Sequence, residues 1–95
     1  MNDVEPLYQE ALELTHRMLA CARAQDWDAL APLGEQRLAT VKAAIGQPGY
    51  LSSTEKQRLS EIISEIERES AEIIERVECW QEHVRILLRM NKPTS

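Results

Sequence analysis

The stretch Leu51–Lys92, LSSTEKQRLSEIISEIERESAEIIERVECWQEHVRILLRMNK, decides the fold, because it runs for about forty residues without a Gly or a Pro. Its apolar residues recur at steps of three and four that average about 3.5, once Ser70 is counted as the one polar member. The apolar members are Leu59, Ile62, Ile66, Ile73, Val77, Trp80, Val84 and Leu87. This period predicts one helix over residues 53–90, roughly 55 Å long, with a single apolar seam.

Two shorter helices are predicted before it, over residues 4–24 and 27–45. Asp3 and Asp26 are N-cap residues by type, since their side chains can accept hydrogen bonds from the first backbone N–H groups of a helix. Apolar residues are frequent in both segments, so each helix should contact its neighbours along a broad face.

The interruptions between these helices are also visible in the sequence. Pro32 removes a backbone hydrogen bond beyond the first turn of the second helix, so we expect a kink there or a short irregular turn before the main helix starts near Ala31. The residues GQPGY at 46–50 read as a loop. Ser52 and Glu55 then form a capping box, which places the start of the long helix directly after the loop.

Short connections make successive helices antiparallel neighbours. The sequence therefore predicts an all-α fold, a single domain over residues 1–95 built as an antiparallel up-down-up three-helix bundle with a long C-terminal helix. At the same rise per residue, the long helix should project past the other two by about 20 Å. The projecting part should carry Trp80, Val84, Leu87 and Leu88.

Charge and composition limit the partners. The chain has 16 acidic and 11 basic residues and a net charge of −5, so it lacks the positive surface of a general nucleic-acid binder, and Arg85, Arg89 and Lys92 form only a small basic patch. The polar start and the absence of a long apolar run predict a cytoplasmic protein without a membrane partner. Cys21 and Cys79 read as free thiols of a reducing compartment.

Two spacings resemble metal ligands, but neither completes a site. Glu13 and His16 form one Glu-x-x-His motif, whereas di-metal helical bundles use two with further acids. Cys79 and His83 lie one turn apart, yet no second pair exists, and Cys79 reads as a small apolar filler beside Trp80. A helical chorismate mutase would need converging basic side chains, which the acidic surroundings disfavour. We therefore predict no catalytic residue, no metal and no cofactor.

The apolar seam of the long helix is the strongest candidate for function. An apolar stripe that outruns its neighbours must be covered by another polypeptide. The alternatives are packing against the first helix or a second copy of the chain, which would form a homodimer, and binding of a client helix. The predicted partner-binding residues are Ile73, Val77, Trp80, Val84, Leu87 and Leu88.

Three segments resemble the FliT-type flagellar export chaperones. They are LYQEALELT at residues 7–15, AQDWDAL at residues 24–30, and the stretch 33–38 with Glu35 and Arg37. The Asp-Trp-Asp-Ala-Leu element is the sharpest of these. Chain length, acidic balance and the long third helix are also similar to that family, and the resemblance covers most of the chain.

The resemblance implies a cytoplasmic chaperone of flagellar type III export whose client is the filament-cap protein. Family members are also linked to the export ATPase complex and, in some bacteria, to the flagellar master regulator. A chaperone for the hook-filament junction proteins and a self-associating helical adaptor are the alternatives. Longer members carry a further C-terminal helix that covers the client surface, and the printed sequence stops at Ser95, so we expect no autoinhibition of that kind.

Overall fold

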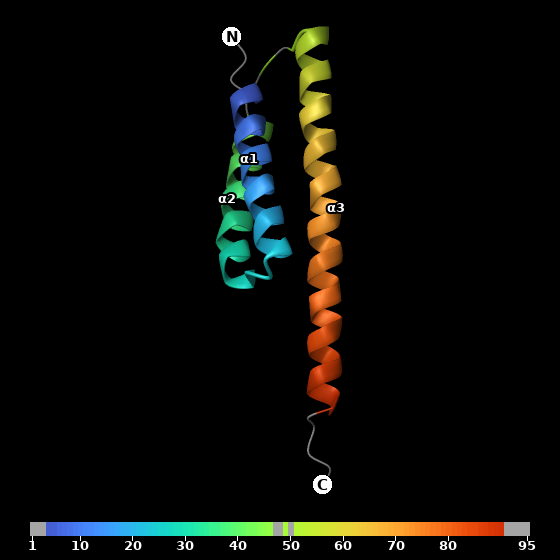
Figure 1. Ribbon diagram of the computed structural model, residues 1–95. Helices are drawn as coiled ribbons and strands as arrows, with labels where there is room; N and C mark the ends of the chain where they lie inside the picture. Colours follow the sequence, from blue (N-terminus) through green and yellow to red (C-terminus); the bar gives the residue numbers. More distant parts are fainter. Residues whose placement is uncertain (1–3, 47–48, 50, 91–95) are drawn as a thin grey trace.

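A computed structural model describes residues 4–46, 49 and 51–90, and these residues form three helices and no strand (Figure 1). The helices are α1 (Val4–Arg23), α2 (Trp27–Ile45) and α3 (Ser53–Met90). The predicted all-α fold is confirmed, and each predicted boundary agrees within one residue. The expected cap at Asp3 and most of the predicted 46–50 loop lie outside the described residues.

The helix ends are fixed by local hydrogen bonds. Asp26 caps α2 as predicted, because its Oδ1 accepts from the Ala29 N–H at 3.3 Å. The predicted capping box of α3 is also present: the Ser52 N–H donates to the Glu55 carboxylate at 3.3 Å, and the Glu55 N–H donates to the Ser52 hydroxyl at 3.2 Å. The turn between α1 and α2 is closed by Gln25 in the left-handed region, with φ at 60°.

The prediction at Pro32 is wrong in one respect. The expected irregular turn before Ala31 is absent, since α2 is a single uninterrupted helix from Trp27 through Pro32 to Ile45. The missing N–H of Pro32 leaves the Asp28 carbonyl without its helical donor, but Asp28 and Pro32 are both exposed. Water can therefore satisfy that carbonyl, and the Asp26 cap holds the first turn in place.

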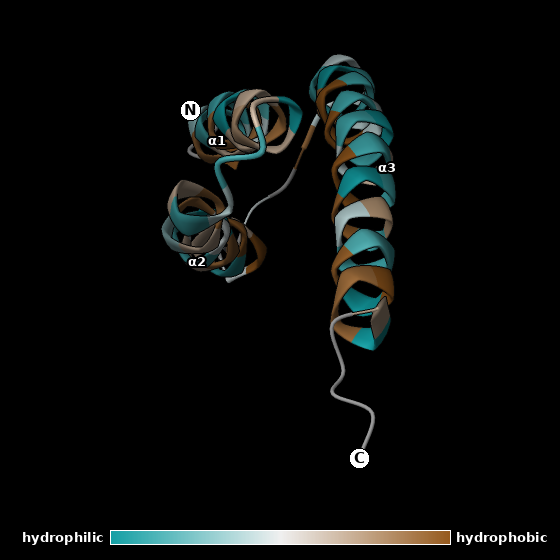
Figure 2. Ribbon diagram, turned by 60° about the horizontal axis from the view of Figure 1, so that its bottom comes forward, coloured by the Kyte–Doolittle hydropathy of each residue, from teal (hydrophilic) through white to brown (hydrophobic). Residues whose placement is uncertain are grey.

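Helix α1 lies between the other two. It packs closely against both α2 and α3, whereas the backbones of α2 and α3 make no close contact within the described residues. Figure 2 shows α1 and α2 side by side with α3 across from them. The core is formed by buried residues of α1 and α3 and by partly buried residues of α2 and α3: Met18, Leu19, Ala22 and Ile73, packed with Trp27, Leu30, Leu33 and Val77.

Helix α3 is much longer than its companions. With 38 residues against 20 for α1, it spans about 57 Å against about 30 Å. It continues well past the turn between α1 and α2, as predicted (Figure 1). Trp80 marks the end of the covered part, because its ring packs on Trp27 with centroids 5.3 Å apart. The expectation that Trp80 lies on the projecting part is therefore wrong, and we define the overhang as residues 81–90.

Candidate partner-binding surface

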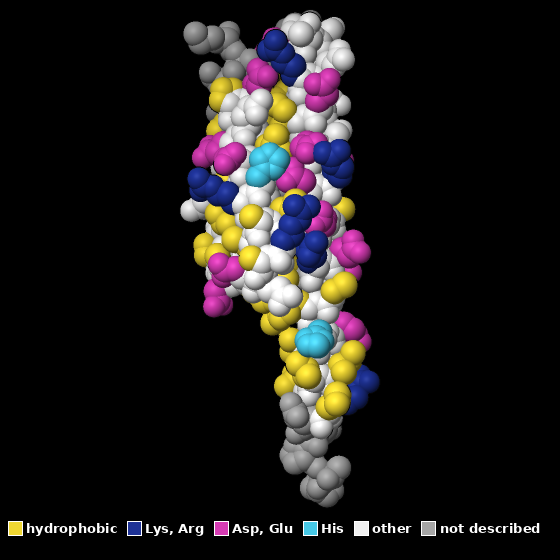
Figure 3. All heavy atoms as spheres, viewed as in Figure 1, with side chains coloured by type: hydrophobic (Ala, Val, Ile, Leu, Met, Phe, Trp, Pro, Cys, Tyr) yellow, Lys and Arg dark blue, Asp and Glu magenta, His cyan; other side chains and the backbone are white. Residues whose placement is uncertain are grey.

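The overhang carries apolar side chains that nothing in the described part of the chain covers. Val84 is half-buried along its own helix, and the exposed members are Ile86, Leu87, Leu88 and Met90. Figure 3 shows hydrophobic side chains, in yellow, gathered on the section of α3 that extends below the rest of the molecule. Such a cluster on an isolated helix is typical of a protein–protein contact.

The six residues predicted from the seam fall into three groups. Ile73 is buried in the core and Val77 packs against it, so both help to hold α3 on the hairpin formed by α1 and α2. Trp80 lies at the boundary, 38% exposed and in contact with Trp27. The remaining three, Val84, Leu87 and Leu88, lie on the overhang. The structure thus places the predicted residues on one helix but gives them different surroundings.

A cleft opens at the boundary between the hairpin and the overhang, which we call the step cleft. Its volume is about 840 Å³. Its walls come from the end of α1, the turn that follows it and α3, and they combine the tryptophan pair with charged groups: Arg23, Gln25, Trp27, Glu72, Arg76, Trp80 and His83 among others. The Trp27 Nε1 atom is buried here without a hydrogen-bond acceptor in the described residues. The cleft is therefore lined by both aromatic and charged side chains.

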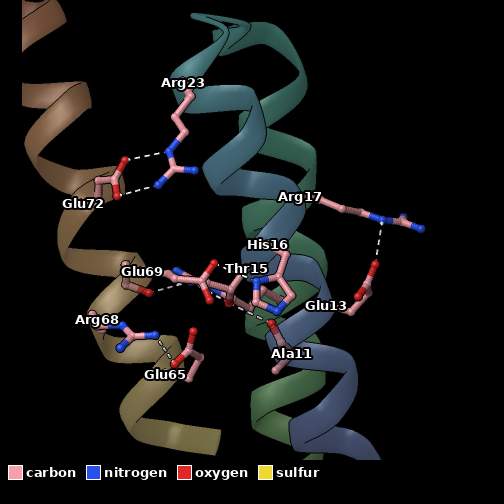
Figure 4. Close-up of polar contacts among 12 residues, drawn as sticks. Ala11, Glu13, Thr15, His16, Arg17, Arg23, Glu65, Arg68, Glu69 and Glu72 are labelled. Carbon is pink, nitrogen blue, oxygen red and sulfur yellow. Dashed lines mark hydrogen bonds and ion pairs between the residues drawn. The ribbon is translucent and has the colours of Figure 1, made fainter.

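Ion pairs fix α1 on α3 next to this cleft (Figure 4). The Arg23 guanidinium donates twice to the Glu72 carboxylate, at 2.8 and 2.9 Å, and Arg76 donates to the same group at 2.8 Å. The hydrogen bonds from Arg23 and then Arg76 lower the pKa of Glu72 to about 2. The Glu72 carboxylate in turn raises the pKa of Arg23. These ion pairs join α1 to α3 and orient α3 without a metal ion.

The Glu-x-x-His motif of α1 has its two members in separate pairs. The ring of His16 lies 2.7 Å from the Glu69 carboxylate of α3, through its Nδ1, whereas Glu13 approaches Arg17 of its own helix at 3.9 Å (Figure 4). Among the described residues no group of three His, Cys, Asp or Glu side chains could hold a metal ion. Cys79 is a free thiol, as predicted, but it is exposed at the step cleft, so its interpretation as a small apolar filler beside Trp80 is wrong.

A second apolar surface, which sequence reasoning missed, lies where α2 and α3 face each other. Trp27, Leu38 and Ile45 share one stripe of α2, and the Trp27 end of this stripe contacts α3 through Trp80. On α3, Ile74 follows one turn after Ser70, which is hydrogen-bonded to α2. Leu38, Ile45 and Ile74 are each more than half exposed.

We call this surface the α2–α3 face, and define it by the exposed apolar residues Leu38, Ile45 and Ile74 together with the hydrogen-bonded pair Arg37 and Ser70. The spacings of 11 and 7 residues between Trp27, Leu38 and Ile45 were a signal for the stripe on α2. No spacing in the sequence indicates that α2 and α3 both pack on α1 while their own backbones make no close contact within the described residues.

The comparisons with known proteins place the chain in a family. No described helix is both long and apolar enough to span a bilayer. No curated protein and no solved structure shows significant similarity to the chain. The family "Flagellar protein FliT", in contrast, matches residues 5–94, which include all three helices. The chain therefore belongs to the FliT family of flagellar proteins.

Proposed function

We propose that the protein is a cytoplasmic chaperone of flagellar type III export that binds and shields an amphipathic segment of the filament-cap protein before secretion. Membership of the FliT family supports a flagellar role. The observation that carries the proposal is the overhang, which presents Leu87 and Leu88 on a helix that the hairpin does not reach. A surface of this kind suits a helical client better than a small molecule.

The mechanism is occlusion of an aggregation-prone helix. The client segment lies along α3 from the overhang to the step cleft and continues over neighbouring residues of α2. Contacts with Val84, Leu87 and Leu88 supply affinity, with Trp80 as the central aromatic anchor. Charged groups around this surface set the register and the association rate. Contact with the export ATPase complex would then follow client loading, as the family suggests.

Titration calorimetry with the purified filament-cap protein tests this proposal. Trp80→Ala and Leu87→Ala should each weaken binding, Trp80→Ala by ~2 kcal/mol or more, because aromatic anchors dominate such interfaces. Gln57→Ala is the matched control, since Gln57 is exposed on the same helix far from the overhang. Circular dichroism must show that each variant keeps its helices. If Trp80→Ala folds and binds as the parent does, the assignment of the site is wrong.

Light scattering separates the remaining possibilities for the same surface. A monomer or dimer that becomes a defined complex with the cap protein supports the chaperone proposal. A stable oligomer that ignores the cap protein supports a self-associating adaptor. Binding of the hook-filament junction proteins in place of the cap protein supports the other client class. Each outcome gives a different mass, so one instrument decides between the three.

A further inference from the structure

Arg37 occupies an unusual position in the centre of the α2–α3 face. It starts on α2 and crosses to the other two helices, where its Nη1 donates to the Thr15 hydroxyl at 3.2 Å and to the Ser70 hydroxyl at 2.8 Å. Thr15 is fully buried, so the guanidinium lies at the level where the three helices meet. Ser70, the one polar member of the α3 seam, is thereby explained as an acceptor for Arg37.

The charge of Arg37 is not neutralised within the described part of the chain. Both of its acceptors are uncharged hydroxyls, and none of the ion pairs formed among the described residues includes Arg37. Burial lowers the pKa of this arginine, which shows that its environment disfavours the charge. A half-buried cation without a carboxylate is costly, so a carboxylate brought to it would be bound strongly.

The guanidinium also has free donors in the right place. Its Nε and Nη2 groups donate no hydrogen bond to the described residues, and neither is a buried atom without a partner, so both keep access to solvent. Two exposed apolar side chains lie near this polar group along the two helices: Leu38 follows Arg37 on α2, and Ile74 follows Ser70 by one turn on α3. The face therefore combines exposed apolar side chains with one cation that can donate to a carboxylate in bidentate fashion.

We infer that Arg37 selects the client, by binding a carboxylate that an amphipathic helix carries in the middle of its apolar face. The inference rests on the proposed function for the existence of a helical client, and adds the chemistry that the client must have. Acceptable occupants are helices with a central Asp or Glu flanked by Leu, Ile, Val or Met. A helix with a central Lys or Arg is rejected by repulsion in the same place.

We expect the fold to tolerate the loss of the Arg37 charge. Thr15 donates to the Ala11 carbonyl at 2.7 Å, a hydrogen bond that does not involve Arg37, so its buried hydroxyl would keep a partner. Because burying an unpaired charge is unfavourable, an apolar side chain of similar length at this position should cost the fold little. A purely structural arginine would behave in the opposite way, because its loss would lower the melting temperature.

Three variants of the full chain test the inference against the cap protein. Arg37→Met should keep or raise the melting temperature and weaken binding by about tenfold or more, since a desolvated charge pair is lost. Lys42→Met is the matched control: it removes one positive charge from an exposed site of the same helix and should leave binding within about twofold. Leu38→Ala reports independently on whether the client touches the α2–α3 face.

A panel of synthetic amphipathic helices gives a second readout that does not depend on the cap protein. The peptides differ only in the residue at the centre of the apolar face, which is Glu, Gln or Lys. The parent chain should prefer Glu over Gln and Gln over Lys, and Arg37→Met should bind the three alike.

The outcomes separate the two proposals. Suppose that the cap protein binds the parent chain, and that Leu38→Ala weakens this binding but Arg37→Met does not. This result leaves the proposed function intact and overturns the role of Arg37. A cap protein that does not bind at all contradicts the proposed function, and the peptide panel then decides about Arg37. Equal affinity for the Glu and Lys peptides, or no binding of any peptide, overturns the inference.

Discussion

The covered part of α3 and the overhang carry the same apolar period but have different surroundings. Ile73 in the covered part is 5% exposed, whereas Leu87 in the overhang is 44% exposed, although both belong to one seam of one helix. The hairpin decides the difference, because α1 and α2 have only 20 and 19 residues and the turn that joins them lies beside Trp80. A regular apolar stripe therefore shows which side of a helix can be covered by other helices. The length of the neighbouring helices decides how much of that side is covered.

The largest expected effect is on the free energy of unfolding at the covered seam. Ile73→Ala should lower it by about 3 kcal/mol, since the change removes buried methyl groups and leaves a cavity among Met18, Leu19 and Ala22. Leu87→Ala is the matched change in the overhang and should stay within about 0.5 kcal/mol of the parent. Urea unfolding monitored by circular dichroism measures both variants.

The contrast between the covered part of α3 and the overhang is contradicted if the two variants lose the same free energy of unfolding. Equal losses would mean that the overhang is covered in solution. Because a second copy of the chain would produce such cover, the measurement should be repeated over a range of protein concentrations, where an effect of dimerisation grows with concentration.

Much of the fold was predictable because it depends on local chemistry. The period of α3, the Asp26 cap and the Ser52–Glu55 box each involve residues within a few positions of one another. The ion pairs Glu65–Arg68 and Glu72–Arg76 are also local, since they join residues three and four positions apart on α3.

The parts that could not be predicted depend on which helices lie side by side. The contacts of Arg23 with Glu72, of His16 with Glu69 and of Arg37 with Ser70 each join residues more than thirty positions apart. No spacing in the sequence identifies these pairs. The expectation that Trp80 lies on the projecting part fails for the same reason. Its contact with Trp27 depends on where the hairpin of α1 and α2 turns, which the apolar seam of α3 does not indicate.

A smaller effect on stability is expected at the turn of the hairpin, which sets the boundary between the covered part of α3 and the overhang. Asp26→Ala should lower the free energy of unfolding by about 1 kcal/mol, because the Ala29 N–H loses its side-chain acceptor. Asp28→Ala is the control, since Asp28 is also acidic and in the first turn of α2 but is not its cap. Thermal unfolding of the three proteins in one buffer gives the comparison. Identical midpoints for both variants would show that the cap contributes nothing.

The smallest expected effect is a dependence of stability on pH that comes from the covered part of α3. The pKa of Glu72 is about 2 in the fold and 4.5 in its ordinary state, so ionised Glu72 stabilises the folded chain above about pH 4.5. This contribution should disappear as the pH falls from about 4.5 towards 2. Because the pair is partly exposed, the change should be modest and should shrink in high salt.

Urea titrations at several acidic pH values test this effect. Glu72→Gln should flatten the dependence of stability on pH over that window, and Arg23→Gln should do so in part, since Arg23 is the first cause of the shift. A Glu72→Gln variant whose stability falls with acid as steeply as that of the parent would show that other carboxyl groups dominate the acid response.

The contact between Trp27 and Trp80 has an optical consequence. These are the chain's only two indoles, and their ring planes are inclined at 44° with 5.3 Å between centroids. The electronic transitions of two indole rings this close couple to each other. Any event that lifts the hairpin from the long helix, or inserts a guest between the rings, will change the emission without an added dye. The protein thus contains an intrinsic fluorescent reporter at the junction between the covered part of α3 and the overhang.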